Sequence, residues 1–486
     1  MSESTSTLNY EKSFKLRNLE EKAAVQLNSY VGNLLYDKGV ELVIFRDHLT
    51  DRNTSGILNL HEYAREVVGK PIDVSITSTL AKALNNLENL SPSKIDIGKL
   101  ASEWIDEKAN FSDENAFVEN KLADFLNGPS PNIEPRDVIL FGFGRIGRLA
   151  ARELIKQAGK GQQLRLRAIV TRSLDEKTLK KRASLLRMDS VHGPFAGTII
   201  EDFKNSSLII NGQVVKMITA NSPEEIDYTA YNISNALVID NTGVYRDREA
   251  LSRHLKSKGA SKVLLTAPGA EIANVVYGVN QNIIEKDENI VSAASCTTNA
   301  ITPVLKVIND NLGIEKGHIE TIHSYTNDQN LLDNMHKKER RGRSAAINMV
   351  ITETGAGKAV TKAIPDLKNK LTANAVRVPT PNGSLAIMKL SITKATTKEE
   401  VNKLLKHAAL NGALVNQIKY SFDPELVSND IIGNNCCAIF DSPATIVHPN
   451  GKDIVLYSWY DNEFGYTKQV IRLAKYICKV RRLIYY

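Results

Sequence analysis

The spacing of apolar residues divides the chain into two regions of different character. Over residues 19–35, apolar positions recur three and four apart, which is the pattern of one face of an amphipathic helix. Similar stripes run over residues 80–87 and 117–125. No glycine-rich loop, no metal-spaced group of His or Cys and no fixed repeat occurs in this region. We therefore predict that residues 1–134 form an all-α extension, whose role the pattern does not indicate.

The pattern changes after a segment rich in turn-forming residues. Residues 127–131 combine Asn, Gly, Ser and two prolines, and Pro135 follows soon after. Next come an apolar run over 137–141, a helical stripe from Ile146 to Leu154, and a second apolar run over 164–170. Strand, helix and strand within about thirty residues predict a βαβ unit, hence an α/β fold with a parallel sheet.

A glycine motif lies between the first predicted strand and its helix. Residues 142–147 read G-F-G-R-I-G, so Gly142, Gly144 and Gly147 occupy the three glycine positions of G-x-G-x-x-G. In this context the first glycine permits a tight turn, the second lets the backbone approach a pyrophosphate, and the third lets helix and strand pack closely. The motif therefore predicts a dinucleotide site at the start of a helix.

The end of the second strand bears on the choice of dinucleotide. An acidic residue there binds the ribose 2′-hydroxyl and repels a 2′-phosphate. The chain instead has Thr171, Arg172 and Ser173, with no acid before Asp175. This run can accept a 2′-phosphate, or Arg172 can be an ordinary solvated side chain. Both NAD and NADP stay open as cofactors.

Composition and charge limit the class of protein. The chain has 486 residues, 42% hydrophobic and 24% charged, which is typical of a soluble globular protein of about three domains. Four cysteines indicate a reducing compartment. We find no secretory signal and no apolar run of the ~20 residues that span a bilayer, so we expect a cytoplasmic protein.

The net charge of +7 is unevenly distributed. Residues 1–134 carry 14 basic and 21 acidic side chains, and residues 135–486 carry 48 basic and 34 acidic ones. A basic body of this kind attracts nucleic acid, an anionic membrane or a phosphorylated small molecule, and the charge alone does not distinguish them.

A candidate nucleophile lies at a second strand-to-helix corner. A strand-like run over 290–294 leads into S-C-T-T-N at 295–299, and a helical apolar stripe continues to Leu312. Cys296 is thus close to a helix N-terminus, which favours the reactive thiolate. A nucleophilic cysteine needs a base. His323, at the end of a predicted half-buried strand, is a candidate for that role.

An ordered series of motifs identifies the family that the chain resembles. They are GFGRIG at 142–147, SCTTN at 295–299, HSYTNDQ at 323–329, RRGRSAA at 340–346, TGAGKAV at 354–360, RVPTPN at 377–382 and WYDNEFGY at 459–466. Residues 137–476 resemble glyceraldehyde-3-phosphate dehydrogenase almost end to end. The acidic first third makes the chain similar to a long form of that family.

The resemblance implies a fold and its domain limits. It implies a doubly wound Rossmann-type parallel sheet over 135–295, with its last helix supplied by 462–486. It further implies an α+β catalytic domain with a mixed, partly antiparallel sheet over 296–461.

It also implies residue roles. Cys296 resembles the nucleophile and His323 the general base. The residues implied to bind the cofactor are Gly142, Gly144, Arg145, Ile146, Gly147, Thr171, Arg172, Thr242, Gly243, Asn462 and Tyr466. Those implied to bind the substrate phosphate or inorganic phosphate are Ser295, Thr297, Thr326, Arg343, Thr354, Gly355 and Arg377. No metal site is implied.

The activity implied is the phosphorylating oxidation of D-glyceraldehyde 3-phosphate with NAD or NADP, in glycolysis or gluconeogenesis, through a thiohemiacetal and a thioester on Cys296. A homotetramer is implied as well, and Arg340, Arg341 and Arg343 could equally belong to a loop between subunits. Two phosphates and a dinucleotide account for the basic body, so neither nucleic acid nor membrane is required. The alternatives are oxidation of erythrose 4-phosphate and a non-enzymatic regulatory or RNA-binding protein on the same fold.

Three features depart from the family pattern or fall outside it. Thr171 stands where most NAD-dependent members have Asp. Gly383 stands where a β-branched residue is usual, without a functional explanation. The ending K-V-R-R-L-I-Y-Y, residues 479–486, is a terminal helix end or a segment that binds a partner.

Overall fold

A computed structural model describes residues 10–127, 133–156 and 162–486. The chain divides into two compact units. The first comprises Met1–Glu134, Ala158–Gln163 and Arg481–Tyr486, and the second comprises Pro135–Gln157 and Leu164–Val480. Of the predicted linker at 127–131, residues 128–131 lie outside the described part.

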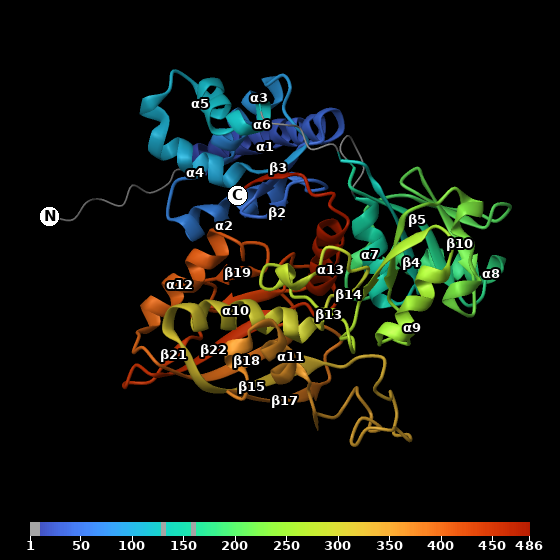
Figure 1. Cartoon of the computed structure of the whole chain (residues 1–486). Helices are drawn as coiled ribbons and strands as arrows, with labels where there is room; N and C mark the ends of the chain where they lie inside the picture. The colour runs from blue at the N-terminus through green and yellow to red at the C-terminus, as the bar shows by residue number, and fades with distance from the viewer. Residues whose placement is uncertain (1–9, 128–132, 157–161) are drawn as a thin grey trace. The chain divides into compact units, whose positions relative to one another are not determined.

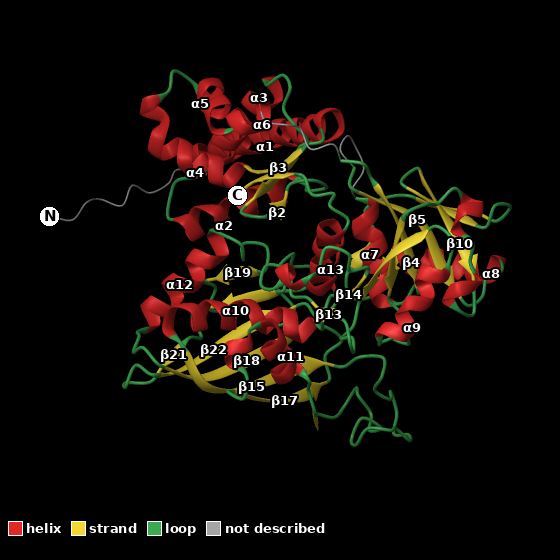
Figure 2. Ribbon diagram, viewed as in Figure 1, coloured by secondary structure: helices red, strands yellow, loops and turns green. Residues whose placement is uncertain are grey.

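The first unit contains helices and a small sheet, as Figure 2 shows by colour. Its helices are α1 (Tyr10–Lys38), α2 (Thr54–Val68), α3 (Val74–Asn86), α4 (Ile97–Glu107), α5 (Glu114–Lys121) and α6 (Ala123–Asn127). Its strands are β1 (Glu41–Ile44), β2 (Asp47–His48), β3 (Ser93–Asp96) and β23 (Leu483–Tyr485), in the order β2-β1-β3-β23.

The prediction of an all-α extension is therefore wrong in one respect. The helical stripes at 19–35 and 80–87 lie in α1 and α3, but 117–125 is broken at Leu122 between α5 and α6. The sequence did not predict these strands because they are only two to four residues long, which is too short to show an alternation of apolar and polar residues. The residues 479–486 are not a helix end either, since β23 pairs in parallel with β3.

Asp96 is the polar centre of this unit. It is fully buried at the end of β3, and its carboxylate accepts hydrogen bonds from the backbone N–H groups of Phe45, Arg46, Gly98 and Lys99. The Arg46 guanidinium, 3% exposed, lies 3.3 Å from the same carboxylate. One side chain thus caps α4 and holds the tight β1–β2 turn, where Phe45 and Arg46 have positive φ.

We expect Asp96→Ala to destabilise the first unit by about 3–5 kcal/mol, because it removes the carboxylate that balances the buried Arg46 charge. Hydrogen exchange of the intact chain should show faster exchange over residues 41–48 and 93–101. Asp106→Ala is the matched control, since Asp106 pairs with Lys70 at an exposed site and should change stability by less than ~1 kcal/mol. Unchanged protection in the Asp96 variant would contradict this assignment.

The second unit begins with a nine-stranded sheet, in the order β13-β14-β12-β11-β4-β5-β10-β9-β8. Its strands are β4 (Arg136–Phe141), β5 (Leu164–Thr171), β8 (Ile199–Asp202), β9 (Ser207–Ile210), β10 (Gln213–Thr219), β11 (Ala236–Asp240), β12 (Ala260–Leu265), β13 (Ala273–Asn274) and β14 (Ile290–Ser292). The pairs from β13 to β10 are parallel, and β8 and β9 add an antiparallel edge. Helices α7 (Arg145–Ile155), α8 (Glu176–Arg187) and α9 (Arg248–Ser252) belong to this part, with the short hairpin β6 (Met188–Asp189) and β7 (Gly193–Pro194).

The order of the strands along the chain predicts where this sheet binds a ligand. From β4 the chain proceeds outward through β5 to β10, then returns to β11 on the other side of β4. Doubly wound sheets bind ligands at such a switch point, beyond the carboxyl ends of the strands. Gly142 follows β4 directly at this position. The predicted Rossmann-type sheet is confirmed.

A second sheet completes the unit, in the order β16-β17-β15-β18-β22-β20-β19. Its strands are β15 (Ile314–Ser324), β16 (Val350–Thr352), β17 (Leu371–Val378), β18 (Ser384–Ile392), β19 (Ile418–Ser421), β20 (Ala438–Asp441), β21 (Ile446–Val447, paired with β22) and β22 (Asp453–Tyr460). Both parallel and antiparallel pairs occur, as predicted. Helices α10 (Cys296–Leu312), α11 (Ala356–Ala363) and α12 (Lys398–Leu410) accompany it, and α10 lies along the sheet (Figure 1).

The last helix, α13 (Phe464–Ile477), returns to the nucleotide-binding part of the unit. It packs against α7, and Lys468 Nζ lies 2.7 Å from a carboxylate oxygen of Glu153. Both side chains of this ion pair are buried. Among the described helices of the chain, none is long and apolar enough to cross a membrane.

Candidate active site

The three glycines of the loop after β4 differ in what surrounds them. Gly142 has φ +95°, and a Cβ there would lie 3.0 Å from the Thr242 side chain. A Cβ at Gly147 would lie 2.4 Å from the carbonyl oxygen of Gly142, so only glycine permits this approach. A Cβ at Gly144, in contrast, would have no heavy atom within 4 Å apart from those of its neighbours along the chain. The open space at the start of α7 fits a pyrophosphate.

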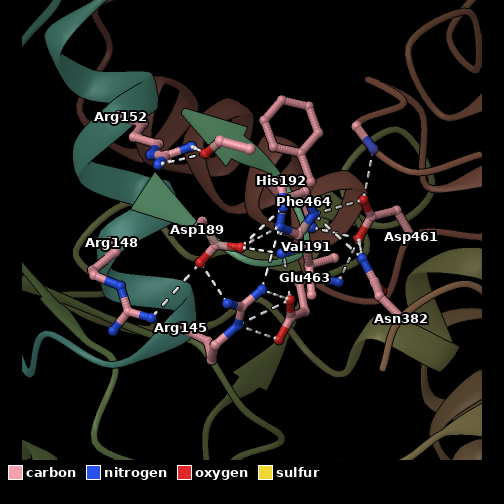
Figure 3. Close-up of polar contacts among 12 residues, drawn as sticks. Arg145, Arg148, Arg152, Asp189, Val191, His192, Asn382, Asp461, Glu463 and Phe464 are labelled. Carbon is pink, nitrogen blue, oxygen red and sulfur yellow. Dashed lines mark hydrogen bonds and ion pairs between the residues drawn. The ribbon is translucent and has the colours of Figure 1, made fainter. Parts of the chain in front are cut away.

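Arg145, the first residue of α7, belongs to an ionic network drawn in Figure 3. Its guanidinium forms ion pairs with Glu463 and Asp189. Asp189 also accepts from the N–H groups of Val191 and His192, at 3.0 and 2.9 Å. Although burial opposes ionisation, these hydrogen bonds and the charge of Arg145 lower the pKa of Asp189 to about 2. Arg145 was predicted to bind the cofactor; its guanidinium is engaged by Glu463 and Asp189, and its backbone lies at the start of α7.

The network continues through His192 to the segment before α13 (Figure 3). His192 Nε2 lies 2.9 Å from Asp461, and Asn382 donates to the same carboxylate at 2.8 Å. Asp461 in turn accepts from the N–H groups of Glu463 and Phe464. Through Arg145, His192 and Asp461, the network therefore links the glycine loop, the 189–192 turn and the start of α13 around Asn462.

Asn462 and Tyr466 are both buried and fixed by hydrogen bonds. Asn462 Oδ1 accepts from Ser384 Oγ at 2.9 Å, which leaves its amide N–H₂ to donate. Tyr466 OH donates to the carbonyl of Ala294 at 2.8 Å, two residues before Cys296. Gly383, unexplained by sequence, precedes Ser384 with φ +87°, and a Cβ there would meet the Ser428 carbonyl at 2.4 Å. Only glycine fits this turn.

The other predicted cofactor residues end the strands β5 and β11. Thr171 is buried, and its hydroxyl donates to the Ser173 carbonyl at 3.1 Å, whereas Arg172 is exposed. Thr242 bonds to Asp240 through its N–H and hydroxyl, and Gly243 has φ +67°. Ile146 is half-buried in the first turn of α7. All lie at the carboxyl edge of the sheet.

Cys296 is the first residue of α10, and Ser295 caps this helix by accepting from Thr298 N–H at 3.0 Å. His323, next to last in β15, is 5% exposed. Its Nε2 lies 3.7 Å from Cys296 Sγ. The structure thus brings together the two residues that the sequence proposed as nucleophile and base.

The neighbours of His323 indicate which ring nitrogen carries the hydrogen. Nδ1 lies 2.7 Å from the carbonyl oxygen of Ser324, and a carbonyl can only accept. Hydrogen at Nδ1 satisfies this contact and leaves the Nε2 lone pair directed at Cys296. Arg377 Nη1 lies 3.0 Å from the same ring nitrogen; with the hydrogen at Nδ1, it donates instead to the Ser324 carbonyl at 2.9 Å and to Thr326 Oγ1 at 3.2 Å.

Electrostatics keep this pair neutral. Burial, and then the charge of Arg377, lower the pKa of His323 to about 3. Burial raises the pKa of the Cys296 thiol, while Arg377 and Thr297 act in the opposite direction. The expectation that the helix start favours the thiolate left burial out of account, and burial is the largest influence on the pKa of this thiol. A neutral imidazole beside the thiol is ready to accept its proton.

Arg377 provides the positive charge of the site. Its pKa is lowered by burial, and its Nε is a buried donor without a hydrogen-bond partner among the described residues. Arg341 is buried and forms an ion pair with Asp328. Although burial raises the pKa of Asp328, a hydrogen bond from Thr326 and the charge of Arg341 lower it overall. Two guanidinium groups and one carboxylate leave a net positive charge for an anion.

Arg343 was predicted to contribute to this anion site, and the structure does not support that prediction. Its side chain is 66% exposed and pairs with Asp333 at 2.9 Å. Arg341, two residues earlier, is directed inward instead, where its Nε donates to Thr352 at 3.1 Å. The segment is irregular, so no periodicity distinguishes the two arginines in the sequence.

We expect Arg377→Gln to raise the pKa of Cys296, because Arg377 is the charge that favours the thiolate. Alkylation of Cys296 by iodoacetamide, followed against pH without substrate, should have its inflection at higher pH than in the unmodified chain. Arg343→Gln is the matched control and should leave the profile in place. An unchanged or lower inflection in the Arg377 variant contradicts the electrostatic assignment.

The remaining predicted anion-site residues lie at two helix starts. Ser295 and Thr297 begin α10, and the Thr297 hydroxyl lies 3.1 Å from Tyr460 OH. Thr354 accepts from Ala356 N–H at 3.2 Å, and Gly355 caps α11, which packs on α10. Within residues 10–127, 133–156 and 162–486, no group of three His, Cys, Asp or Glu side chains is arranged to hold a metal ion.

Comparison with known families agrees with this geometry. Residues 136–248 match the family model of the glyceraldehyde 3-phosphate dehydrogenase NAD binding domain, and residues 295–462 match that of its C-terminal domain. A glyceraldehyde-3-phosphate dehydrogenase-like protein of Pseudomonas aeruginosa is 49% identical over 449 residues, which is 92% of this chain and 96% of the relative.

Two shorter relatives match a smaller share of the chain. The glyceraldehyde-3-phosphate dehydrogenase of Clostridium acetobutylicum is 38% identical over 71% of this chain and 99% of its own length. Glyceraldehyde-3-phosphate dehydrogenase 2 of Nostoc is 41% identical over 70% of this chain and 98% of its own length. The match to the Pseudomonas protein is longer than residues 135–486, so it includes much of the first unit.

Proposed function

Because the chain belongs to the glyceraldehyde-3-phosphate dehydrogenase family, we propose that it oxidises D-glyceraldehyde 3-phosphate to 1,3-bisphosphoglycerate with NAD or NADP and inorganic phosphate, in glycolysis or gluconeogenesis. The observation that carries this proposal is the pair of Cys296 and His323, with 3.7 Å between Sγ and Nε2, beside the half-buried Arg377.

In the first step, Sγ of Cys296 attacks the aldehyde carbon. Nε2 of His323 takes the thiol proton and passes it to the carbonyl oxygen, so a thiohemiacetal forms on Cys296. In the oxidation, Nε2 takes the hydroxyl proton and a thioester remains on the sulfur. A bound nicotinamide supplies the hydride acceptor. The backbone N–H groups at the start of α10 favour negative charge on the oxygen.

In the last step, inorganic phosphate attacks the thioester carbon and the C–S bond breaks. The acyl phosphate leaves, the sulfur recovers the proton held by His323, and the proton of the attacking hydrogen phosphate is released to solvent. For the two anions we assign Arg377 and Thr326 to the substrate phosphate, since they are hydrogen-bonded to each other beside His323. Ser295, Thr297, Thr354 and Gly355 are assigned to inorganic phosphate, with Arg341 in the place first given to Arg343.

For the cofactor we propose that NADP is used as well as NAD. Thr171 and Ser173 offer no carboxylate at the end of β5, and Arg182 of α8 donates to the Ser173 carbonyl at 3.3 Å. The Nε of Arg182 is buried without a hydrogen-bond partner within the described residues. A guanidinium at this position favours a 2′-phosphate.

We expect Arg182→Gln to lower kcat/KM for NADP by about tenfold, the loss of one charge-assisted hydrogen bond, while kcat/KM for NAD changes little. Steady-state kinetics with both cofactors measure this. Equal losses with NAD and NADP would show that Arg182 does not contact the 2′-phosphate.

The substrate is tested by an assay of the unmodified chain that crosses glyceraldehyde 3-phosphate and erythrose 4-phosphate with NAD and NADP. The proposal predicts that kcat/KM is highest with glyceraldehyde 3-phosphate and that the formation of NAD(P)H depends on inorganic phosphate. A preference for erythrose 4-phosphate supports the sister activity. Absence of NAD(P)H formation with either aldehyde favours a non-enzymatic role on the same fold.

We also propose that the second unit assembles into a homo-oligomer, a tetramer by family resemblance. The segment after β15 exposes large apolar side chains, which are 73% to 91% accessible: Leu331, Leu332, Met335, Ile347 and Met349. An exposed group of this kind is typical of a subunit interface. Sedimentation equilibrium measures the assembly, and a monomer would contradict it.

A further inference from the structure

The first unit holds residues 481–486 at the edge of its sheet. β23 pairs in parallel with β3, and Leu483, Ile484 and Tyr485 lie opposite Ser93, Lys94 and Ile95. In the sheet order β2-β1-β3-β23, this strand is the last one. Addition of an extended segment to a sheet edge is a common mode of peptide recognition.

The hydrophobic core of the unit is complete without this strand. Every buried member of its main apolar cluster, among the described residues, lies between Ala24 and Leu122. Of residues 481–486, Tyr485 packs against the cluster and is only partly buried. A strand that belongs to a fold contributes buried residues to the core, whereas a bound peptide lies on a core that is already closed. β23 fits the second description.

Side-chain contacts of the acceptor surround the strand. Arg482 is 8% exposed and lies 3.7 Å from Glu41 of β1. The Tyr485 ring packs edge-on against Phe125 at 6.2 Å, and its hydroxyl donates to Glu103. Each contact pairs a group of the strand with a complementary group of the acceptor.

The end of the segment is held by two cations. The Arg46 guanidinium lies 5.1 Å from the centre of the Tyr486 ring, and Lys99 Nζ lies 4.8 Å from that of Tyr485. Lys99 also donates to the main-chain oxygen of Tyr486. Arg46 is fixed from behind by the buried Asp96. In contrast, the Ile484 side chain is 46% exposed.

Charge favours the same pairing. Residues 1–134 carry 14 basic and 21 acidic side chains, and the segment brings two consecutive arginines, Arg481 and Arg482. The acidic surplus of the extension, which the catalytic reaction does not require, here meets a basic ligand.

We propose that the edge of β3, with Glu41, Arg46, Lys99 and Phe125 around it, is a peptide-binding site, and that residues 481–486 are its resident, exchangeable ligand. The site takes an extended segment with an arginine at one end and two aromatic residues at the other. The N-terminal extension is then a strand-binding module rather than part of the catalytic machinery.

The test uses a chain that ends at Val480 and a fluorescent peptide of sequence R-R-L-I-Y-Y, followed by fluorescence anisotropy without substrate or cofactor. We expect saturable binding with one peptide per chain, and binding at least about tenfold weaker to the intact chain, whose site is filled. Alanine at the position of Tyr485 in the peptide should weaken binding by about thirtyfold, because the Tyr485 side chain contacts Phe125, Lys99 and Glu103 of the acceptor. Lysine at the position of Ile484 is the matched control and should bind like the parent peptide.

Equal affinity of the shortened and intact chains, or of the parent and alanine peptides, would overturn the proposal. If the shortened chain aggregates, the full-length Tyr485→Ala/Tyr486→Ala variant decides by hydrogen exchange. The proposal then predicts faster exchange over 93–96 while 41–44 stays protected, and an unchanged rate over 93–96 overturns it. Both readouts are independent of catalysis, so they stand apart from the proposed dehydrogenase activity.

Discussion

Cys296→Ser should lower kcat for aldehyde oxidation by about 10⁴-fold or more, because the thioester step requires the sulfur nucleophile. The serine hydroxyl occupies the same start of α10, so the Ser295 cap and the His323 contact have no reason to change. Steady-state formation of NAD(P)H from glyceraldehyde 3-phosphate measures the loss, and thermal unfolding should be close to that of the unmodified chain.

Cys478→Ser is the control for this prediction. Its thiol, whose pKa burial raises to about 11, lies near Arg136 and Lys262 at the amino ends of β4 and β12. Cys296 follows the carboxyl end of β14, at the opposite edge of the sheet. The control should keep full activity. Activity of the Cys296 variant within tenfold of the unmodified chain would refute the proposed nucleophile.

His323→Asn should lower kcat by about 10²–10⁴-fold, the range expected when a positioned general base is lost. Asparagine can keep a hydrogen bond to the Ser324 carbonyl, but it offers no lone pair of imidazole basicity to Cys296 Sγ. Because burial, and then the charge of Arg377, lower the pKa of His323 to about 3, the imidazole is neutral at ordinary working pH, and protonation of His323 should not limit the rate of the unmodified chain.

His318→Asn is a matched control, since His318 lies on the same strand and is half exposed, with hydrogen bonds to Thr372 and Asn374. Single-turnover kinetics separate the oxidation from product release. If the oxidation and product release keep their rates in the His323 variant, another group takes the proton.

Local sequence signals predicted the parts of the site that lie at regular chain positions. Gly142, Gly144 and Gly147 follow a strand and open a helix, and Cys296 opens α10 behind a serine cap, so motif and period agree there. Arg341 could not be told from Arg343, because both lie in an irregular segment where burial depends on Asp328 and Thr352. The effect of burial on Cys296 was also missed, since a motif shows the helix start but not the enclosure.

The sheet of the first unit was missed for a different reason. β3 is four residues long, and its partner β23 lies almost at the other end of the sequence. Pairing at such a separation leaves no local pattern, and the alternation in R-L-I-Y is too short to distinguish a strand from a helix end. The requirement for glycine at position 383 likewise depends on a residue distant in sequence, because a Cβ there would lie 2.4 Å from the carbonyl oxygen of Ser428.

The most direct test of the central claim is mass spectrometry of the chain after reaction with glyceraldehyde 3-phosphate and NAD in the absence of inorganic phosphate. The account predicts a 3-phosphoglyceroyl thioester on the peptide that contains Cys296, and its disappearance when phosphate is added. Formation of NADH with no acyl group on Cys296, or an acyl group on another cysteine, would contradict the account.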